Sequence, residues 1–158
     1  MKSILFVCTG NICRSPTAEG VFKRFVAEAG LEGRIASDSA GTHGYHVGEP
    51  PDPRTQHAAS RRGYDLSVLR ARQVSLSDFG EFDYLLAMDQ GNLLVLQRLC
   101  PPQHADRLRL FMEFGADPAV REVPDPYYGG AQGFERVLDM VEQASRGLLE
   151  HLRGRITP

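Results

Sequence analysis

Hydrophobic positions near the N-terminus first form an unbroken run and then recur at helical spacing. Residues 3–8 form a short apolar run, which is typical of a buried strand in a parallel sheet. After a loop, Ser15 is placed to cap a helix, Pro16 suits its first position and Gly30 closes it. The apolar residues of this helix are Ala18, Val21, Phe22, Phe25, Val26 and Ala29. The chain is therefore predicted to open with a strand, a loop and a helix.

Strand and helix patterns continue to alternate along the rest of the chain. A second short strand is predicted at residues 34–39, and a loop in which Pro51 and Pro53 bar regular structure precedes a helix near 55–62. Strands are predicted at 82–89 and 107–114, and helices at 92–99 and 132–152. This alternation indicates an α/β fold with a mostly parallel four-stranded sheet flanked by helices. We find no repeat or linker, so residues 1–158 are predicted to form a single domain.

Composition and charge narrow the classes of function. The chain has 158 residues, of which 42% are hydrophobic and 24% charged, as in ordinary globular proteins. Its formal net charge of -2 gives no sign of a nucleic-acid or anionic-membrane partner. Three cysteines argue against a disulfide scaffold and for a reducing compartment. No apolar segment resembles a signal peptide or a membrane span, so we expect a cytoplasmic protein.

The loop after the first strand carries more reactive chemistry than a turn requires. Five residues separate Cys8 from Arg14, and Gly10 and Asn11 suit a tight, left-handed turn. Amides in such a turn, at a helix N-terminus, form a nest for a phosphate-sized anion that Arg14 would also bind. The same donors would stabilise a Cys8 thiolate, a nucleophile aimed at the phosphate, and Ser15 would donate to the sulfur as it leaves. The plain alternative is a buried thiol beside a solvated arginine.

These residues resemble the signature loop of the low-molecular-weight protein tyrosine phosphatases, V-C-x-G-N-x-C-R-S, at every fixed position of residues 7–15. Similar segments follow in the same order: DSAGT at 38–42, ARQV at 71–74, MDQGN at 88–92 and VPDPYYGG at 123–130. The resemblance implies hydrolysis of protein phosphotyrosine through a phosphocysteine on Cys8, with phosphate bound by Arg14. It implies no metal and no cofactor, and a phosphotyrosine-containing protein as the partner.

The resemblance also implies roles for residues beyond Cys8 and Arg14. Asp125 would be the general acid and then the general base, although an Asp-Pro pair is by itself ordinary turn chemistry. Ile12 goes with phosphotyrosine preference, since relatives that resemble phosphoarginine phosphatases carry Thr there. The other residues expected to bind or support the phosphate are Thr9, Gly10, Asn11, Cys13, Ser15 and Ser39. Those expected to line the substrate pocket are Tyr45, Tyr127 and Tyr128.

Three further positions bear on this interpretation. Leu69 stands where the family commonly has His, which implies a smaller hydrogen-bond network between Ser39 and Asn11. Cys13 can, in the family, bond to the nucleophile and protect it from oxidation, or it is an ordinary small loop residue. Asp89 precedes a helix and is explained equally well as its N-cap, so no catalytic role is assigned to it.

Other classes of protein share parts of this pattern. Arsenate reductases resemble the family but need a resolving pair of cysteines, and only Cys100 follows the loop. A non-catalytic phosphate-binding protein would require neither the Cys8 thiolate nor Asp125. Zinc binding by His43 and His46 lacks the further ligands of a four-coordinate site.

Overall fold

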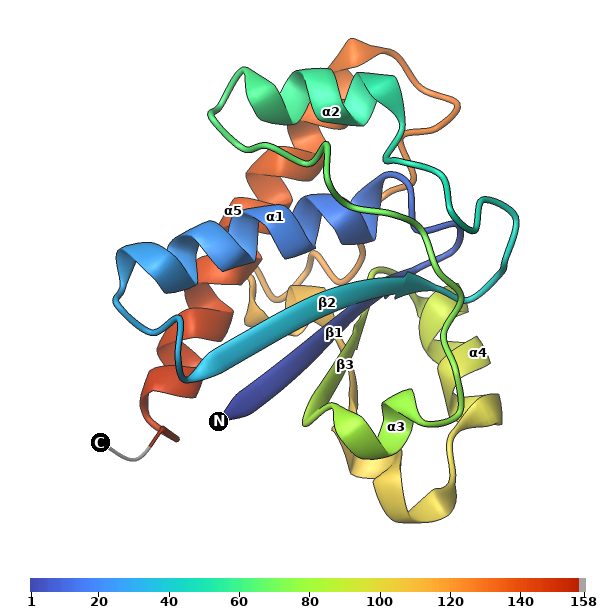
Figure 1. The fold of residues 1–158 in the computed structure, drawn as a ribbon, viewed down its shortest axis with the longest axis vertical. Coiled ribbons are helices and arrows are strands. Elements are labelled where there is room, and N and C mark those ends of the chain that lie inside the picture. Colours follow the sequence, from blue (N-terminus) through green and yellow to red (C-terminus); the bar gives the residue numbers. More distant parts are fainter. Residues whose placement is uncertain (157–158) are drawn as a thin grey trace.

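A computed structural model describes residues 1–156, which fold around one parallel sheet (Figure 1). Its strands are β1 (Lys2–Cys8), β2 (Ile35–Gly41), β3 (Tyr84–Ala87) and β4 (Leu108–Leu110). They are hydrogen-bonded in the order β2-β1-β3-β4, and every pairing is parallel. The predicted α/β fold with a four-stranded sheet is therefore confirmed.

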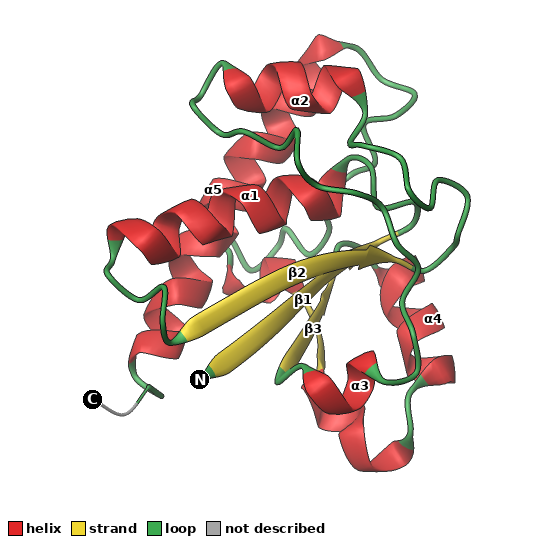
Figure 2. Cartoon of the chain, in the orientation of Figure 1, coloured by secondary structure: helices red, strands yellow, loops and turns green. Residues whose placement is uncertain are grey.

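Helices cover both faces of the sheet (Figure 2). They are α1 (Arg14–Glu28), α2 (Pro53–Ser60), α3 (Asp78–Glu81), α4 (Gln90–Leu99) and α5 (Ala131–Arg153), with 3-10 helices η1 (Pro102–Arg107) and η2 (Phe111–Phe114). Ile4 and Phe6 of β1 pack with α1 and α5, whereas Leu5 and Val7 pack with α3 and α4. Because successive strand residues face opposite sides, this burial on both faces explains the continuous apolar run. No helix within residues 1–156 is long and apolar enough to cross a membrane.

The first helix begins differently from the prediction. It starts at Arg14, with Cys13 at the N-cap position, so the prediction that Ser15 caps it is wrong. Ser15 lies inside the first turn, and its hydroxyl contacts Cys8 and Asn11 instead. The prediction that Gly30 closes the helix is confirmed, since Gly30 has a positive φ of 73° just after the C-cap.

Other elements also differ from the predicted boundaries, including β2, which runs to Gly41, and α4, which begins at Gln90. α2 starts at Pro53, because Asp52 caps it and a proline fits the first helical position. β3 is shorter than residues 82–89, since Phe82 ends α3 and Asp89 caps α4. The strand predicted at 107–114 stops at Leu110, and the following residues form η2 because Phe111 packs beneath α1 and α5. α3 and η1 were not predicted.

Candidate active site

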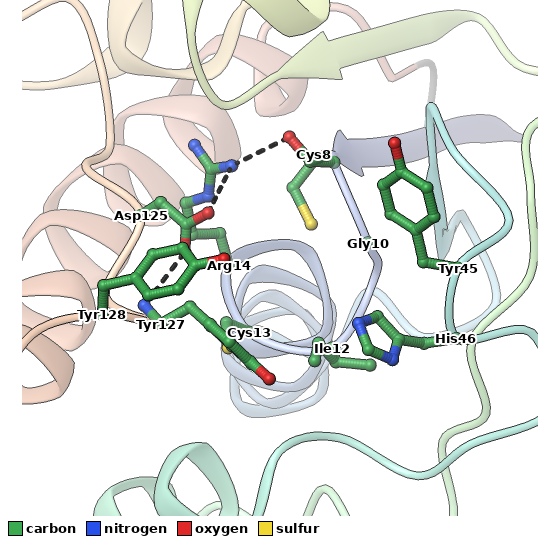
Figure 3. A pocket seen from close by; sticks show the side chains of 11 residues that line it. Cys8, Gly10, Ile12, Cys13, Arg14, Tyr45, His46, Asp125, Tyr127 and Tyr128 are labelled. Carbon is green, nitrogen blue, oxygen red and sulfur yellow. Dashed lines mark hydrogen bonds and ion pairs between the residues drawn. The ribbon is translucent and has the colours of Figure 1, made fainter.

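A cavity of about 330 Å³ opens at the carboxyl end of β1, where the chain enters α1 (Figure 3). Its lining residues are Cys8, Thr9, Gly10, Ile12, Cys13, Arg14, Tyr45, His46, Asp125, Tyr127 and Tyr128. Three other predicted site residues, Asn11, Ser15 and Ser39, are buried beside the loop. The structure therefore brings the predicted residues together at the edge of a parallel sheet where ligands bind.

Asn11 fixes the shape of the loop. It is the one non-glycine residue within the described chain that has a positive φ, 59°. Its side-chain amide donates to Ser15 Oγ at 2.8 Å and to Ser39 Oγ at 3.0 Å, and its Oδ1 accepts from the Arg72 backbone N–H at 3.0 Å. These three hydrogen bonds offset the cost of left-handed backbone at a residue with a Cβ.

Two polar groups lie within hydrogen-bond distance of the Cys8 sulfur. The backbone N–H of Asn11 donates to Cys8 Sγ at 3.3 Å, and Ser15 Oγ lies 3.0 Å from the same sulfur. Ser15 Oγ accepts a hydrogen bond from Asn11, and the acceptors within reach of its own proton are the Cys8 sulfur at 3.0 Å and the Ala40 carbonyl oxygen at 3.4 Å. The sulfur therefore lies among hydrogen-bond donors at the N-terminus of α1.

A buried carboxylate extends this network. Ser39 Oγ donates to Glu19 Oε1 at 2.7 Å, and Glu19, on the inner face of α1, also pairs with Lys23. Leu69 packs against the hydrophobic core near this region rather than joining the polar network. Sequence reasoning missed Glu19, although a glutamate at a core-facing position of α1 was an available signal.

Arg14 is buried and held from several sides. Its NH1 donates to Asp89 Oδ2 at 2.7 Å and to the Val123 carbonyl oxygen at 3.1 Å, and its NH2 donates to Thr9 Oγ1 at 3.3 Å. Burial opposes its charge, but Cys8 and Asp89 outweigh that effect and raise the pKa of Arg14. The guanidinium is therefore a fixed cation beside Cys8.

Asp89 caps α4 and also binds Arg14. Its Oδ1 accepts from the backbone N–H of Asn92 at 2.7 Å, while Oδ2 binds Arg14. Asn92 in turn donates from its side chain to Thr9 Oγ1 at 3.1 Å. The start of α4 thus anchors both Thr9 and Arg14, an arrangement that sequence spacing does not reveal.

Asp125 reaches the cavity from the loop before α5 (Figure 3). Its Oδ1 accepts from the Tyr127 backbone N–H at 3.0 Å, so it does form a turn. Its Oδ2 lies 3.7 Å from Arg14 NH2, and its side chain remains 47% exposed. A half-exposed carboxylate beside the cavity can exchange protons with both solvent and a bound group.

Aromatic side chains form the rim of the cavity. Tyr127 and Tyr128 lie on one side and Tyr45 and His46 on the other, as Figure 3 shows. Tyr128 is 93% exposed, so it is free to contact a large substrate. Sequence reasoning missed His46 as a lining residue.

The two histidines considered for zinc make other contacts. His43 stacks on Tyr45 with ring centroids 5.1 Å apart, and its Nδ1 lies 2.8 Å from Thr42 Oγ1. His46 Nδ1 lies 2.7 Å from Glu49 Oε2. Within residues 1–156, no group of three or more His, Cys, Asp or Glu side chains is arranged to hold a metal ion.

The three cysteines have different surroundings, and each is a free thiol. Cys13 lines the cavity, and burial raises its pKa to about 12. Cys100 lies at the C-cap of α4, where its thiol donates to the Pro101 carbonyl oxygen at 3.3 Å, and it does not line the cavity. A cysteine relay from Cys8 to Cys100 has no support in this arrangement.

Comparison with known proteins gives a consistent result. Residues 3–156 match the family described as low molecular weight phosphotyrosine protein phosphatase. The low molecular weight protein-tyrosine-phosphatase of Streptomyces coelicolor is 49% identical over 97% of this chain and 94% of its own length. The human low molecular weight phosphotyrosine protein phosphatase is 41% identical over 94% of each chain. The crystal structure of a protein tyrosine phosphatase from Entamoeba histolytica superposes with a TM-score of 0.94, at 42% identity and 98% coverage of both chains. The chain therefore belongs to the low-molecular-weight phosphotyrosine protein phosphatases.

Proposed function

We propose that this protein hydrolyses protein phosphotyrosine through a phosphocysteine intermediate on Cys8. Family membership supports phosphotyrosine hydrolysis. The observation that carries the mechanism is the meeting of Cys8, Arg14 and Asp125 in one cavity at the end of β1. The three side chains supply a nucleophile, a fixed cation and a proton donor, which is the set that this reaction needs.

In the first step the Cys8 thiolate attacks phosphorus, and the bond from phosphorus to the tyrosine oxygen breaks. Arg14 and the loop amides hold the phosphoryl oxygens and stabilise their charge in the transition state. Asp125 enters this step protonated and gives its proton to the departing phenolate, whose conjugate acid has a pKa of about 10. The products of the step are the dephosphorylated tyrosine and phosphocysteine.

In the second step a water molecule attacks the phosphorus of the phosphocysteine. The Asp125 carboxylate takes a proton from this water, and the sulfur–phosphorus bond breaks. Cys8 leaves as a thiolate, stabilised by the Ser15 hydroxyl and the Asn11 N–H, and inorganic phosphate is released. Arg14 and the amides supply the charge neutralisation that Mg²⁺ supplies in kinases, so we propose no metal or cofactor requirement.

The walls of the cavity support a preference for an aromatic phosphate ester. Tyr45, Tyr127 and Tyr128 form a rim against which a phosphotyrosine ring can pack. Ile12 lines the cavity where family members that resemble phosphoarginine phosphatases carry Thr, and this supports phosphotyrosine over phosphoarginine. The Drosophila arginine phosphatase has the same fold, with a TM-score of 0.89 at 32% identity.

The setting of this activity is also part of the proposal. Residues 1–158 act as a single phosphatase domain. The protein works in the cytoplasm, where a reducing environment keeps the Cys8 thiol able to react.

Peptide hydrolysis tests this proposal. Phosphotyrosine, phosphoarginine and phosphoserine peptides are incubated with EDTA and wild-type protein, Cys8→Ser or Asp125→Asn. We expect phosphotyrosine turnover by the wild type, none by Cys8→Ser, and a loss of about 10²–10⁴-fold in kcat for Asp125→Asn. Thiol-dependent loss of arsenate without ester hydrolysis would instead identify a reductase.

A further inference from the structure

The loop that carries Asp125 depends on few contacts for its position. Val123 ties the start of this loop to the sheet edge, since its N–H donates to the Met88 carbonyl and its carbonyl accepts from Arg14. Between residues 124 and 130, the backbone hydrogen bond runs within the loop, from Gly129 N–H to the Pro126 carbonyl. One oxygen of Asp125 is taken by Tyr127 within the same loop, and the other is 3.7 Å from Arg14. Beyond the anchor at Val123, side-chain contacts therefore contribute to placing the carboxylate over the cavity.

Arg54, on the first turn of α2, provides such a contact. The centre of its guanidinium lies 5.2 Å from the ring centroid of Tyr127 and 4.9 Å from that of Phe134. Tyr127 follows Asp125 by two residues, and Phe134 lies in the first turn of α5. The guanidinium thus lies between the ring of Tyr127, just after Asp125, and the first turn of α5, at distances where a cation attracts an aromatic face.

Asp52 holds Arg54 in this position and ties it to the phosphate-binding loop. Its Oδ1 accepts from Arg54 Nε at 3.1 Å, and its Oδ2 accepts from Arg54 NH2 at 3.0 Å. The hydrogen bonds from Arg54 hold the pKa of Asp52 below its usual value. The backbone N–H of Asp52 donates to the Ile12 carbonyl oxygen at 2.9 Å. A continuous set of contacts therefore runs from the Cys8 loop through Asp52 and Arg54 to the Asp125 loop.

We infer that Arg54 is a positioning residue, which holds the Asp125 loop through Tyr127 at the place where proton transfer to the leaving group occurs. The inference rests on the proposed function, because it assumes that Asp125 is the general acid. α2 contributes no residue to the cavity lining. Through Arg54 it would nevertheless take part in the first chemical step.

The role predicts a dependence on the leaving group. The phenolate of a weakly acidic phenol, such as that of phenyl phosphate, needs a proton as it departs. A misplaced Asp125 therefore slows its release. A 2,4-dinitrophenolate departs without a proton, so its release is insensitive to where Asp125 lies. Loss of Arg54 should therefore slow the first kind of substrate selectively, whereas general damage to the cavity would slow both.

The test compares kcat/KM for phenyl phosphate and 2,4-dinitrophenyl phosphate in Arg54→Met, Arg54→Lys and Arg61→Met. This ratio covers the steps up to departure of the leaving group and not the second step, in which Asp125 acts as base on an intermediate common to both substrates. Arg61 is the matched control, because it is exposed at the C-cap of the same helix. We expect Arg54→Met to lose about ten-fold or more on phenyl phosphate and little on the dinitrophenyl ester. Arg54→Lys, which keeps a cation, should lose less, and Arg61→Met should match the wild type on both substrates.

Asp125→Asn, measured beside these variants, separates the two hypotheses. If it shows selective loss on phenyl phosphate while Arg54→Met slows both substrates equally or neither, the role of Arg54 is overturned and the general acid stands. If Asp125→Asn itself shows no selectivity, the assignment of the acid fails and the role of Arg54 fails with it. Arg54→Lys no faster than Arg54→Met on phenyl phosphate would also overturn the inference.

Discussion

Arg14 is fixed by protein groups alone, since Asp89, Val123 and Thr9 accept from its guanidinium. A side chain that is already immobilised loses less conformational entropy when phosphate binds. The sequence predicts Arg14, because the C-x5-R spacing and the following helix are local features. It does not predict that one oxygen of Asp89 caps α4 while the other binds Arg14, because that contact joins residues far apart in the chain.

Replacement of Asp89 should weaken catalysis more than folding. In Asp89→Asn the side chain can still cap α4, because Asn caps helices about as well as Asp, but Arg14 loses its charged partner. A charge-assisted hydrogen bond is worth about 1.5–3 kcal/mol, so kcat/KM for a phosphotyrosine peptide should fall by about 10–100-fold. Asp106→Asn, at an exposed position of η1, is the control. An unchanged kcat/KM in Asp89→Asn would show that the ion pair does not support catalysis.

The two cysteines of the loop should differ sharply in reactivity. Only a thiolate reacts readily with iodoacetamide, and burial raises the pKa of Cys13 to about 12. At pH 8 we expect mass spectrometry to find Cys8 alkylated and Cys13 unmodified in the folded protein, with inorganic phosphate slowing the reaction at Cys8. Equal labelling of both thiols in folded protein would contradict this assignment.

The elements with the most regular patterns were predictable, and the shortest helical turns were not. β1, α1 and α5 carry long, regular patterns of buried residues, and their predicted extents agree with the structure to within one or two residues. η2 could not be predicted, since Phe111 and Met112 fit a strand pattern as well as a 3-10 turn, and packing beneath α1 and α5 decides between them. α3 has four residues, too few for a periodic pattern to appear.

Close packing of α5 against η2 gives a test of the fold. A Cβ at Gly147 would lie 1.9 Å from the Phe114 carbonyl oxygen, so α5 and η2 would have to move apart. We expect Gly147→Ala to lower the free energy of unfolding in urea by about 1–3 kcal/mol.

Gly133→Ala in the same helix is the control for this substitution. The added Cβ would lie 3.6 Å from the Pro126 Cβ, an ordinary contact, and alanine favours helix by up to about 1 kcal/mol. A Gly147→Ala protein as stable as Gly133→Ala would show that α5 does not approach η2 this closely.

At the scale of the whole molecule, the meeting of the site residues follows from topology. Cys8 and Arg14 are local to one loop, but Asp125 joins them only because its segment follows β4 and returns to the same sheet edge. Val123 anchors the returning segment, since its N–H donates to the Met88 carbonyl and its carbonyl accepts from Arg14. Strand patterns do not specify the order of strands. The expectation that Asp125 is the general acid therefore comes from family resemblance and not from its spacing.

Overall stability should fall in alkaline solution through Tyr64. Burial, aided by the hydrogen bond from its hydroxyl to Glu142 Oε2 at 2.6 Å, raises its pKa from 10.0 to about 12. The folded state holds the Tyr64 proton more tightly than the unfolded state does. The contribution of Tyr64 to stability is therefore fully present below pH 10 and is lost as the pH rises toward 12. The expected loss is roughly 2–3 kcal/mol.

Tyr64→Phe provides the comparison for this alkaline loss. Urea unfolding of wild type and variant at several pH values from 8 to about 11.5 gives the difference in stability, which should shrink as the pH rises above about 10. A difference that stays constant over this range would exclude Tyr64 as the titrating group.

The parallel sheet has a consequence for how the protein is made on the ribosome. β1 leaves the ribosome first, and its partners β2 and β3 are synthesised later. The groups that bind Arg14, on Asp89 and Val123, are also synthesised later. Pairings this distant in sequence form only once the later segment has emerged. A nascent chain therefore carries Cys8 for most of its synthesis without the contacts that surround it in the folded protein, and the proposed active site is complete only after the segment with Asp125 has been released.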